Sequence, residues 1–221
     1  MQNQASVRIA GEPNDGNIDQ YELISARRAL ALLKGKLGQE RLRELIKEQV
    51  AEGNQLFRDH VKRSAGRTET GKITIEATNL SVADFSGWLS RAFTRQDVLI
   101  AAQPEHYVMD MVDPNGPHVV ETLGDVIVGF YMGGWDQSQV TGENDGVDRR
   151  RSTLRLDDDG TVLGSVSTAF LDAPHGMSAE LSITLPATSA PDAIEQHLEH
   201  FSVEFRSWML AAAAEKQGGG G

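Results

Sequence analysis

The chain has 221 residues, of which 39% are hydrophobic and 24% charged, enough for one large domain with a real core. Its net charge of −11 argues against nucleic acid or an anionic membrane surface as the main partner. The chain contains no cysteine, which excludes disulfides, thiolate nucleophiles and cysteine-bound zinc or iron–sulfur centres. Its first residues lack a signal-peptide pattern and its apolar runs are too short to span a membrane, so a cytoplasmic protein is expected.

The first part of the chain is predicted to be helical. Residues 1–17 are polar and rich in Gly, Asn and Pro, a composition typical of a flexible arm. Apolar residues then recur at helical spacing over 18–66, with Gly38 as a C-cap between two segments. We expect an N-terminal helical hairpin there, serving as a homodimer interface or as a cap over a cavity. Residues 218–221 are all glycine and predict a flexible tail.

Beyond the hairpin the pattern changes to strands. Alternating apolar residues predict a strand at 72–77, and the capping pattern of Ser81 and Asp84 opens a short helix. A series of short strands is expected to follow, at 98–102, 104–111, 118–123, 125–132, 152–156, 161–170 and 178–185. Residues 133–151 predict a long polar loop. The last element is a long helix from about residue 190 to residue 216.

This order of elements predicts the fold class. A strand, a short helix, a run of about six antiparallel strands and one long C-terminal helix form an α+β helix-grip arrangement of the START-like type over residues 72–217. In this arrangement a curved sheet wraps the last helix and leaves a cavity between them. Because helices and strands do not alternate regularly, the pattern argues against a doubly wound parallel sheet.

Three polar side chains lie along one flank of the apolar face of the last helix. His200 and Glu204 are at positions i and i+4 and are therefore neighbours, and His197 precedes them by about one turn. A carboxylate and two imidazoles along a buried edge need hydrogen bonds or a cation, because an unpaired buried charge is costly. The alternative is an ordinary Glu–His pair on a helix surface.

The predicted hairpin adds two residues of the same types. His106 and Glu121 lie on its two strands among apolar neighbours, and strand alternation predicts that His106, Val108 and Asp110 share one face. Imidazole nitrogens and carboxylate oxygens suit a borderline metal such as zinc. These two residues are therefore candidates for the other half of a metal site on the last helix.

These residues and this layout resemble the 2,4-diacetylphloroglucinol hydrolase family, whose relatives include phloretin hydrolase. His200 and Glu204 are similar to that family's His–Glu pair on its last helix, and His106 and Glu121 to its first histidine and glutamate. The resemblance implies a divalent metal, most simply zinc, held by these four residues. The hairpin is shorter here than in the family's longer members, which leaves His118 as an alternative ligand. The family's substrate-binding tyrosines do not map onto this chain.

The resemblance also implies a reaction. It is the metal-dependent hydrolysis of the carbon–carbon bond between a polyphenolic ring and an acyl group, a retro-Claisen cleavage of a small aromatic substrate. The departing ring carbon needs a proton, and His197 is a candidate donor, with a histidine satisfied in the core as the alternative. Two other functions stay open: a non-enzymatic START-like protein that binds an apolar or aromatic small molecule, and a metal-free cyclase or decarboxylase.

Overall fold

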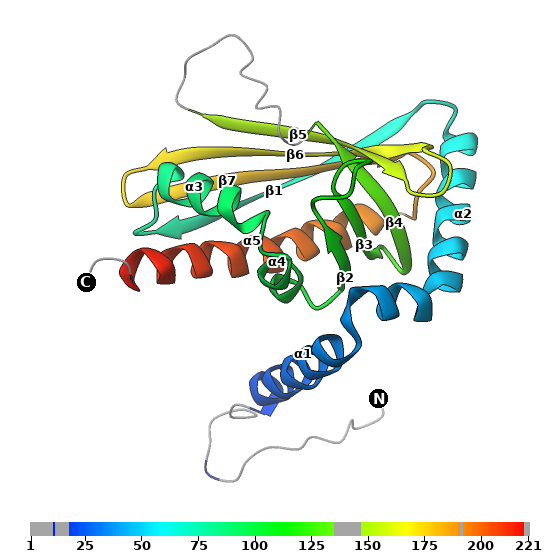
Figure 1. Ribbon diagram of the computed structural model, residues 1–221. Helices are drawn as coiled ribbons and strands as arrows, with labels where there is room; N and C mark the ends of the chain where they lie inside the picture. Colours follow the sequence, from blue (N-terminus) through cyan, green and yellow to red (C-terminus); the bar gives the residue numbers. More distant parts are fainter. Residues whose placement is uncertain (1–10, 12–17, 135–146, 191, 219–221) are drawn as a thin grey trace. The chain divides into compact units, whose positions relative to one another are not determined.

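The computed structural model describes residues 11, 18–134, 147–190 and 192–218 (Figure 1). By its contacts the chain divides into two units, Met1–Gly38 and Gln39–Gly221. The helix α1 (Ile18–Leu45) leaves helical geometry at Gly38, with φ 70° and ψ 165°, where the sequence predicts a cap. None of its side chains is buried in the described chain, and the homodimer or cap role of these helices stays a prediction.

The second unit begins earlier than the sequence suggests. It includes the helix α2 (Lys47–Ser64), which packs against the sheet at β4, so the contacts divide the chain at Gly38 and not near residue 66. The predicted arm over 1–17 lies outside the described residues except for Gly11. The predicted tail also lies outside them, except for Gly218, which ends the last helix.

The strands form one antiparallel sheet in the order β1-β7-β6-β5-β4-β3-β2. The first strand in sequence, β1, therefore pairs with the last, β7, and lies at one edge of the sheet. The bounds of the seven strands are β1 Thr68–Thr78, β2 His106–Asp110, β3 His118–Leu123, β4 Val126–Gly133, β5 Asp148–Leu156, β6 Val162–Ala173 and β7 Gly176–Pro186.

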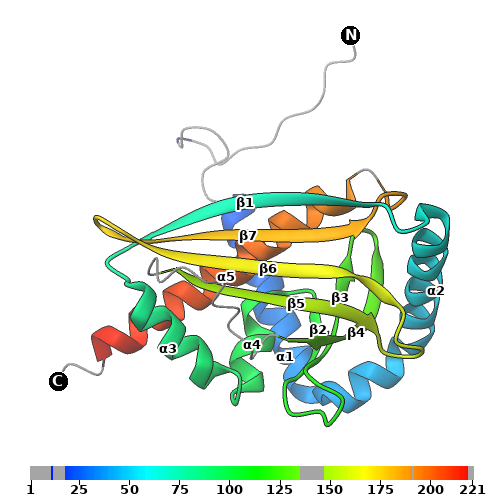
Figure 2. The same ribbon diagram turned by 90° about the horizontal axis from the view of Figure 1, so that it is seen from above.

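The long helix α5 (Ala193–Gly218) lies against one face of this sheet (Figures 1 and 2). It contacts β1, β7 and β3, and the helices α3 (Val82–Ala92) and α4 (Gln96–Ala102) pack beside it. Its buried apolar residues Phe201, Phe205, Trp208 and Met209 belong to the hydrophobic core. This is the helix-grip, START-like fold that the sequence predicts. No helix among the described residues is long and apolar enough to cross a membrane.

Two local expectations need correction. The sequence predicts a strand at 98–102, but this segment is the helix α4. A run of five apolar residues is too short to separate a strand from a buried helix, and here Leu99 and Ala102 point into the core one turn apart. The predicted loop over 133–151 is shorter at its end, because β5 begins at Asp148; residues 135–146 lie outside the described chain.

The strand β2 contains the irregularity that shapes the site. His106 pairs with Glu121, whereas Val108 pairs with Val120, so β2 carries one extra residue. Because opposite residues of an antiparallel pair share a face, His106 lies on the face of Glu121, and Val108 and Asp110 lie on the other. The prediction that His106, Val108 and Asp110 share a face is therefore wrong, because the bulge reverses the alternation after His106.

Candidate metal centre

The four predicted ligands come together between the sheet and the last helix. His106 comes from β2, Glu121 from β3, and His200 and Glu204 from α5. All four are buried, with exposed fractions from 0% for His106 to 6% for the two glutamates. The bulge in β2 brings His106 to the face of Glu121, and one helical turn aligns His200 with Glu204. Residues far apart in sequence thus form one buried cluster.

The donor atoms of this cluster lie close together, and those of three of its residues are mutually close. His106 Nε2 lies 3.1 Å from His200 Nε2, 3.5 Å from Glu204 Oε1 and 3.5 Å from Glu121 Oε2. His200 Nε2 lies 3.6 Å from Glu121 Oε2. One donor atom from each of His106, His200 and Glu204 lies within 4.8 Å of the other two. Such convergence of imidazole nitrogens and carboxylate oxygens is typical of a metal site.

The orientation of His106 is fixed from outside the cluster. Its Nδ1 lies 3.0 Å from the carbonyl oxygen of Leu99. A carbonyl oxygen can only accept, so Nδ1 carries the hydrogen, and in the neutral ring Nε2 directs its lone pair at the cluster. Metal-binding histidines are commonly held by such a bond from the other ring nitrogen. This carbonyl belongs to the helix α4, the segment for which the sequence predicts a strand.

The two glutamates make a cation favourable here. Burial raises the pKa of Glu121, and the charge of His200 opposes this rise. Burial raises the pKa of Glu204 well above its usual range, and the charge of Glu121 adds to this effect. Two carboxyl groups in such a site need either protons or a positive charge. A divalent ion would neutralise both and accept both Nε2 lone pairs, so the donor set fits a metal such as zinc.

His197 lies beside the cluster without belonging to it. Its ring stacks on His200, with centroids 5.2 Å apart, and packs edge-on against Phe201. The side chain is 2% exposed, and neither ring nitrogen has a hydrogen-bond partner among the described residues. Burial lowers the pKa of His197 well below its usual value, and the charges of His200 and His106 lower it further. At neutral pH it is therefore an uncharged imidazole with one N–H to donate.

His118, the alternative ligand, lies outside the cluster. It follows the opposite alternation of β3 and pairs with Asp110 on the other face. Its Nε2 lies 2.8 Å from Asp157 Oδ2, and its Nδ1 lies 3.1 Å from Arg43 Nη2. Both ring nitrogens are therefore engaged in a separate network. The structure does not bring His118 to the other four residues.

An apolar cavity of about 50 Å³ borders Glu121, Glu204 and His197. Aromatic residues, methionines and aliphatic side chains make up most of its other walls, together with Thr168: Phe93, Met109, Met111, Val119, Phe130, Met132, Leu154, Val166, Phe201, Phe205 and Trp208. Phe93, Met111 and Met132 also line a wider pocket of about 630 Å³. We call these three residues the collar, because they lie between the cavity and the wider pocket.

A polar pocket of about 500 Å³ reaches His197 and His200. Two residues that the sequence does not single out, Gln103 and Glu105, line it just before His106. Gln103 Oε1 accepts the N–H of Glu105 at 3.0 Å, and Gln103 Nε2 donates to the carbonyl oxygen of His200 at 3.5 Å. Glu105 Oε2 lies 3.9 Å from His200 Nδ1. Only their position next to a predicted ligand could have suggested them.

No protein-family model and no curated protein matches this chain. Among solved structures, the crystal structure of Ara h 8.0201 is 14% identical with a TM-score of 0.45, covering 67% of this chain and 99% of that chain. A putative uncharacterized protein from Rhizobium leguminosarum is 12% identical with a TM-score of 0.36, covering 66% and 96%. The di-domain ARO/CYC BexL from the BE-7585A biosynthetic pathway is 13% identical with a TM-score of 0.37, covering 89% and 58%. Because these similarities are weak, the helix-grip assignment rests on the sheet order and on the packing of α5 against the sheet.

Proposed function

We propose that this protein is a metal-dependent hydrolase that cleaves the carbon–carbon bond between a polyphenolic ring and an acyl group. The main support is the convergence of donor atoms from His106, Glu121, His200 and Glu204 next to an apolar cavity. These four residues would hold the ion. When bound, a divalent metal such as zinc supplies Lewis acidity and activates water.

In the proposed reaction, the oxygen of water adds to the acyl carbon of the substrate. The bond from that carbon to the ring breaks, its electron pair stays on the ring carbon, and that carbon takes up a proton. The products are a carboxylic acid and the deacylated phenol. The apolar walls of the cavity would hold the ring and limit access of bulk water, which strengthens the electrostatic interactions inside.

His197 is the proposed donor of that proton or of a hydrogen bond to the substrate. It borders the cavity, it is uncharged at neutral pH, and its ring nitrogens have no partner in the described chain. Thr168 and Trp208 line the same cavity, and within the described residues Thr168 Oγ1 and Trp208 Nε1 also have no partner. Buried donors of this kind favour a ligand that carries oxygen acceptors. An aromatic ring with hydroxyl and carbonyl groups meets this requirement.

The small cavity favours a small substrate. Its volume of about 50 Å³ is well below the range of ~300–1,000 Å³ that is typical of ligand pockets. Binding would therefore need the side chains of Met111, Met132 and Phe93 to move, and methionine adapts easily because it is unbranched and flexible. A single-ring acyl phenol is the expected size of substrate.

The proposal is tested by metal analysis and by assay. The purified wild type should hold about one zinc per chain and should release a carboxylic acid from at least one acylphloroglucinol. The variants His200→Ala and Glu204→Ala should lose both the metal and the activity. A metal-free wild type that binds a flat aromatic ketone without cleaving it would contradict the hydrolase.

A second candidate is a START-like binding protein or a metal-free cyclase or decarboxylase. The distance of 3.1 Å between His106 Nε2 and His200 Nε2 favours it, because one proton shared between the two nitrogens satisfies both without an ion. In that case the wild type would contain no metal, and His200→Ala would weaken ligand binding without changing any metal content.

A further inference from the structure

The ligand cluster has two different surroundings. The apolar cavity borders the carboxylates of Glu121 and Glu204, whereas the polar pocket of about 500 Å³ borders the imidazole of His200. Three exposed acidic residues line the polar pocket: Glu105, Asp125 and Glu199. We call it the acidic pocket. His197 lines both spaces and so stands between them.

One buried group is directed at the acidic pocket. His200 is 5% exposed, and its Nδ1 has no hydrogen-bond partner among the described residues. Glu105 Oε2 lies 3.9 Å from this nitrogen. Gln103 holds this geometry, because it bridges the N–H of Glu105 and the carbonyl oxygen of His200. The outer edge of a proposed ligand thus faces a carboxylate at the wall of this pocket.

A cation has to reach a cluster that is almost fully buried. On the side of the cavity it would have to pass the collar of Phe93, Met111 and Met132, which offers no carboxylate. Removing the water around a divalent ion costs much free energy, and the apolar side chains of the collar offer no ligand that would offset this cost. The acidic pocket instead offers carboxylate oxygens and a negative potential that raises the local cation concentration.

We propose that the acidic pocket is the entrance by which a divalent cation reaches the ligands, and that the organic ligand enters separately past the collar. Glu199 and Asp125 attract the ion at the rim, and Glu105 passes it to His200. This inference rests on the metal centre of the proposed function.

The entrance is tested by the rate of metal uptake. The full-length chain, freed of metal with a chelator, is mixed with Co²⁺ in a stopped-flow instrument, and the visible absorption that develops on binding gives the association rate constant. The test variant is Glu105→Gln/Glu199→Gln. The matched control is Glu69→Gln/Glu76→Gln, which removes the same charge from exposed positions on β1. Near-identical far-ultraviolet circular dichroism spectra establish that both variants fold.

We expect the association rate constant of the test variant to fall about 10-fold at low ionic strength, as for the loss of electrostatic steering. The control should fall by less than about twofold, and high salt should remove the difference. The dissociation rate constant should change little, as for charges at a rim. Met132→Trp at the collar should slow the binding of an aromatic ketone and leave Co²⁺ uptake unchanged.

Three results would overturn the entrance. The test variant could take up Co²⁺ at the rate of the control, or Met132→Trp could slow uptake instead. A higher dissociation rate constant with an unchanged association rate constant would mean that the two glutamates only support bound metal. If the wild type takes up no Co²⁺ at all, the metal centre itself fails, and the entrance fails with it.

Discussion

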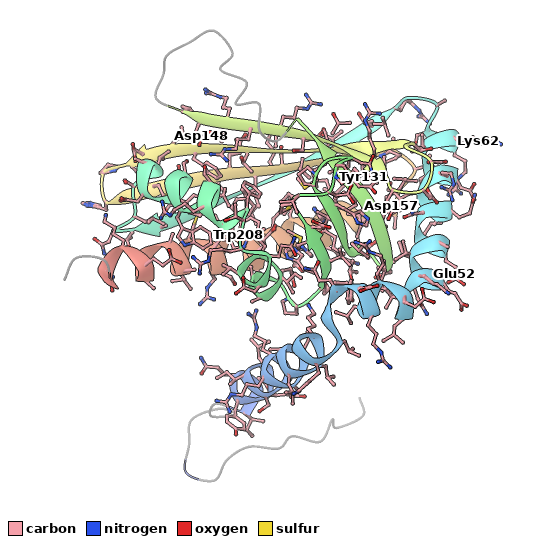
Figure 3. All side chains as sticks on the ribbon, in the orientation of Figure 1. Glu52, Lys62, Tyr131, Asp148, Asp157 and Trp208 are labelled. Carbon is pink, nitrogen blue, oxygen red and sulfur yellow. The ribbon has the colours of Figure 1, made fainter. Side chains whose placement is uncertain are left out.

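Two clusters, each of a buried histidine and a carboxylate, lie on opposite faces of β3. One contains Glu121 and forms the candidate metal centre, and the other contains His118 and Asp157. His118 and Glu121 are only three positions apart, but alternation along the strand sends them to different sides. Figure 3 shows Asp157 near the end of the sheet next to α2. Trp208 of α5, which lines the cavity beside the candidate metal centre, lies away from that end.

The cluster of His118 is satisfied by the protein alone. Arg43 donates to His118 Nδ1, and His118 Nε2–H and Asn54 Nδ2–H donate to Asp157 at 2.8 Å each. Burial would raise the pKa of Asp157, but these hydrogen bonds outweigh it and the pKa lies below its usual value. Gly129 leaves room for the carboxylate of Asp157, because a Cβ at this position would lie only 2.3 Å from Asp157 Oδ2. Each group has its partner, as in a structural network.

The cluster of Glu121 has no such balance. Two carboxyl groups with raised pKa values face two imidazole nitrogens, and neither Arg nor Lys contributes to the ion pairs that the described residues form there. The comparison shows that residue types alone do not identify a site. A site is identified by the polar and charged groups that the fold leaves without a partner, because an unsatisfied buried group needs a ligand.

The largest effect is expected from Glu204→Gln. It should lower the affinity for zinc by more than about 100-fold, because groups that only orient a ligand already change it by about 10–100-fold. The metal-free variant should be at least as stable as the metal-free wild type, since it loses a buried carboxyl with no cation. Zinc competition titration and urea unfolding with a chelator measure the two quantities. Unchanged zinc affinity would remove Glu204 from the centre.

The opposite pattern is expected from Asp157→Ala. It leaves two buried donors, on His118 and Asn54, without an acceptor, at about 1–3 kcal/mol each. We expect the free energy of unfolding to fall by about 2–4 kcal/mol in urea denaturation. The zinc content should not change. A loss of zinc together with normal stability would mean that the two clusters have been assigned the wrong way round.

The acid dependence of stability should separate the clusters again. The folded pKa of Asp157 is depressed, so its stabilisation is fully present above the unfolded pKa of about 3.9 and is lost as the pH falls through the folded value. The variant Asp157→Asn has no carboxyl group at this position and therefore lacks this pH-dependent stabilisation. In urea unfolding series on metal-free protein, the stability gap between wild type and Asp157→Asn should be constant near neutral pH and shrink in acid. A gap that grows in acid would contradict the assignment.

The smallest effect is expected from Thr168→Val. The hydroxyl of Thr168 has no partner among the described residues, so its loss should change the free energy of unfolding by no more than about 1 kcal/mol. The affinity for hydroxylated aromatic ketones, measured by calorimetry, should fall about 3–10-fold, as for one hydrogen bond of ~1 kcal/mol. Ser167→Ala, next to it on β6 but outside the cavity lining, is the control. A large loss of stability would show that the hydroxyl has a structural role.

Much of this protein follows from local pattern. Alternation gave most strands, the capping pair Ser81 and Asp84 gave the start of α3, and helical spacing placed His200 beside Glu204. The exceptions are segments where local pattern is ambiguous. The run 98–102 satisfies both a strand and a helix, and only packing against β2 and α5 decides for α4.

The amino-acid sequence by itself determined the order of the elements except at 98–102, the antiparallel helix-grip fold and four residues whose chemistry suits a metal. Only the tertiary structure decided which histidine of the hairpin belongs to them. One extra residue in β2 puts His106 on the face of Glu121, while His118 faces Asp157. A bulge carries no periodic signal, and hydrogen-bond partners distant in sequence become known only when the strands are paired.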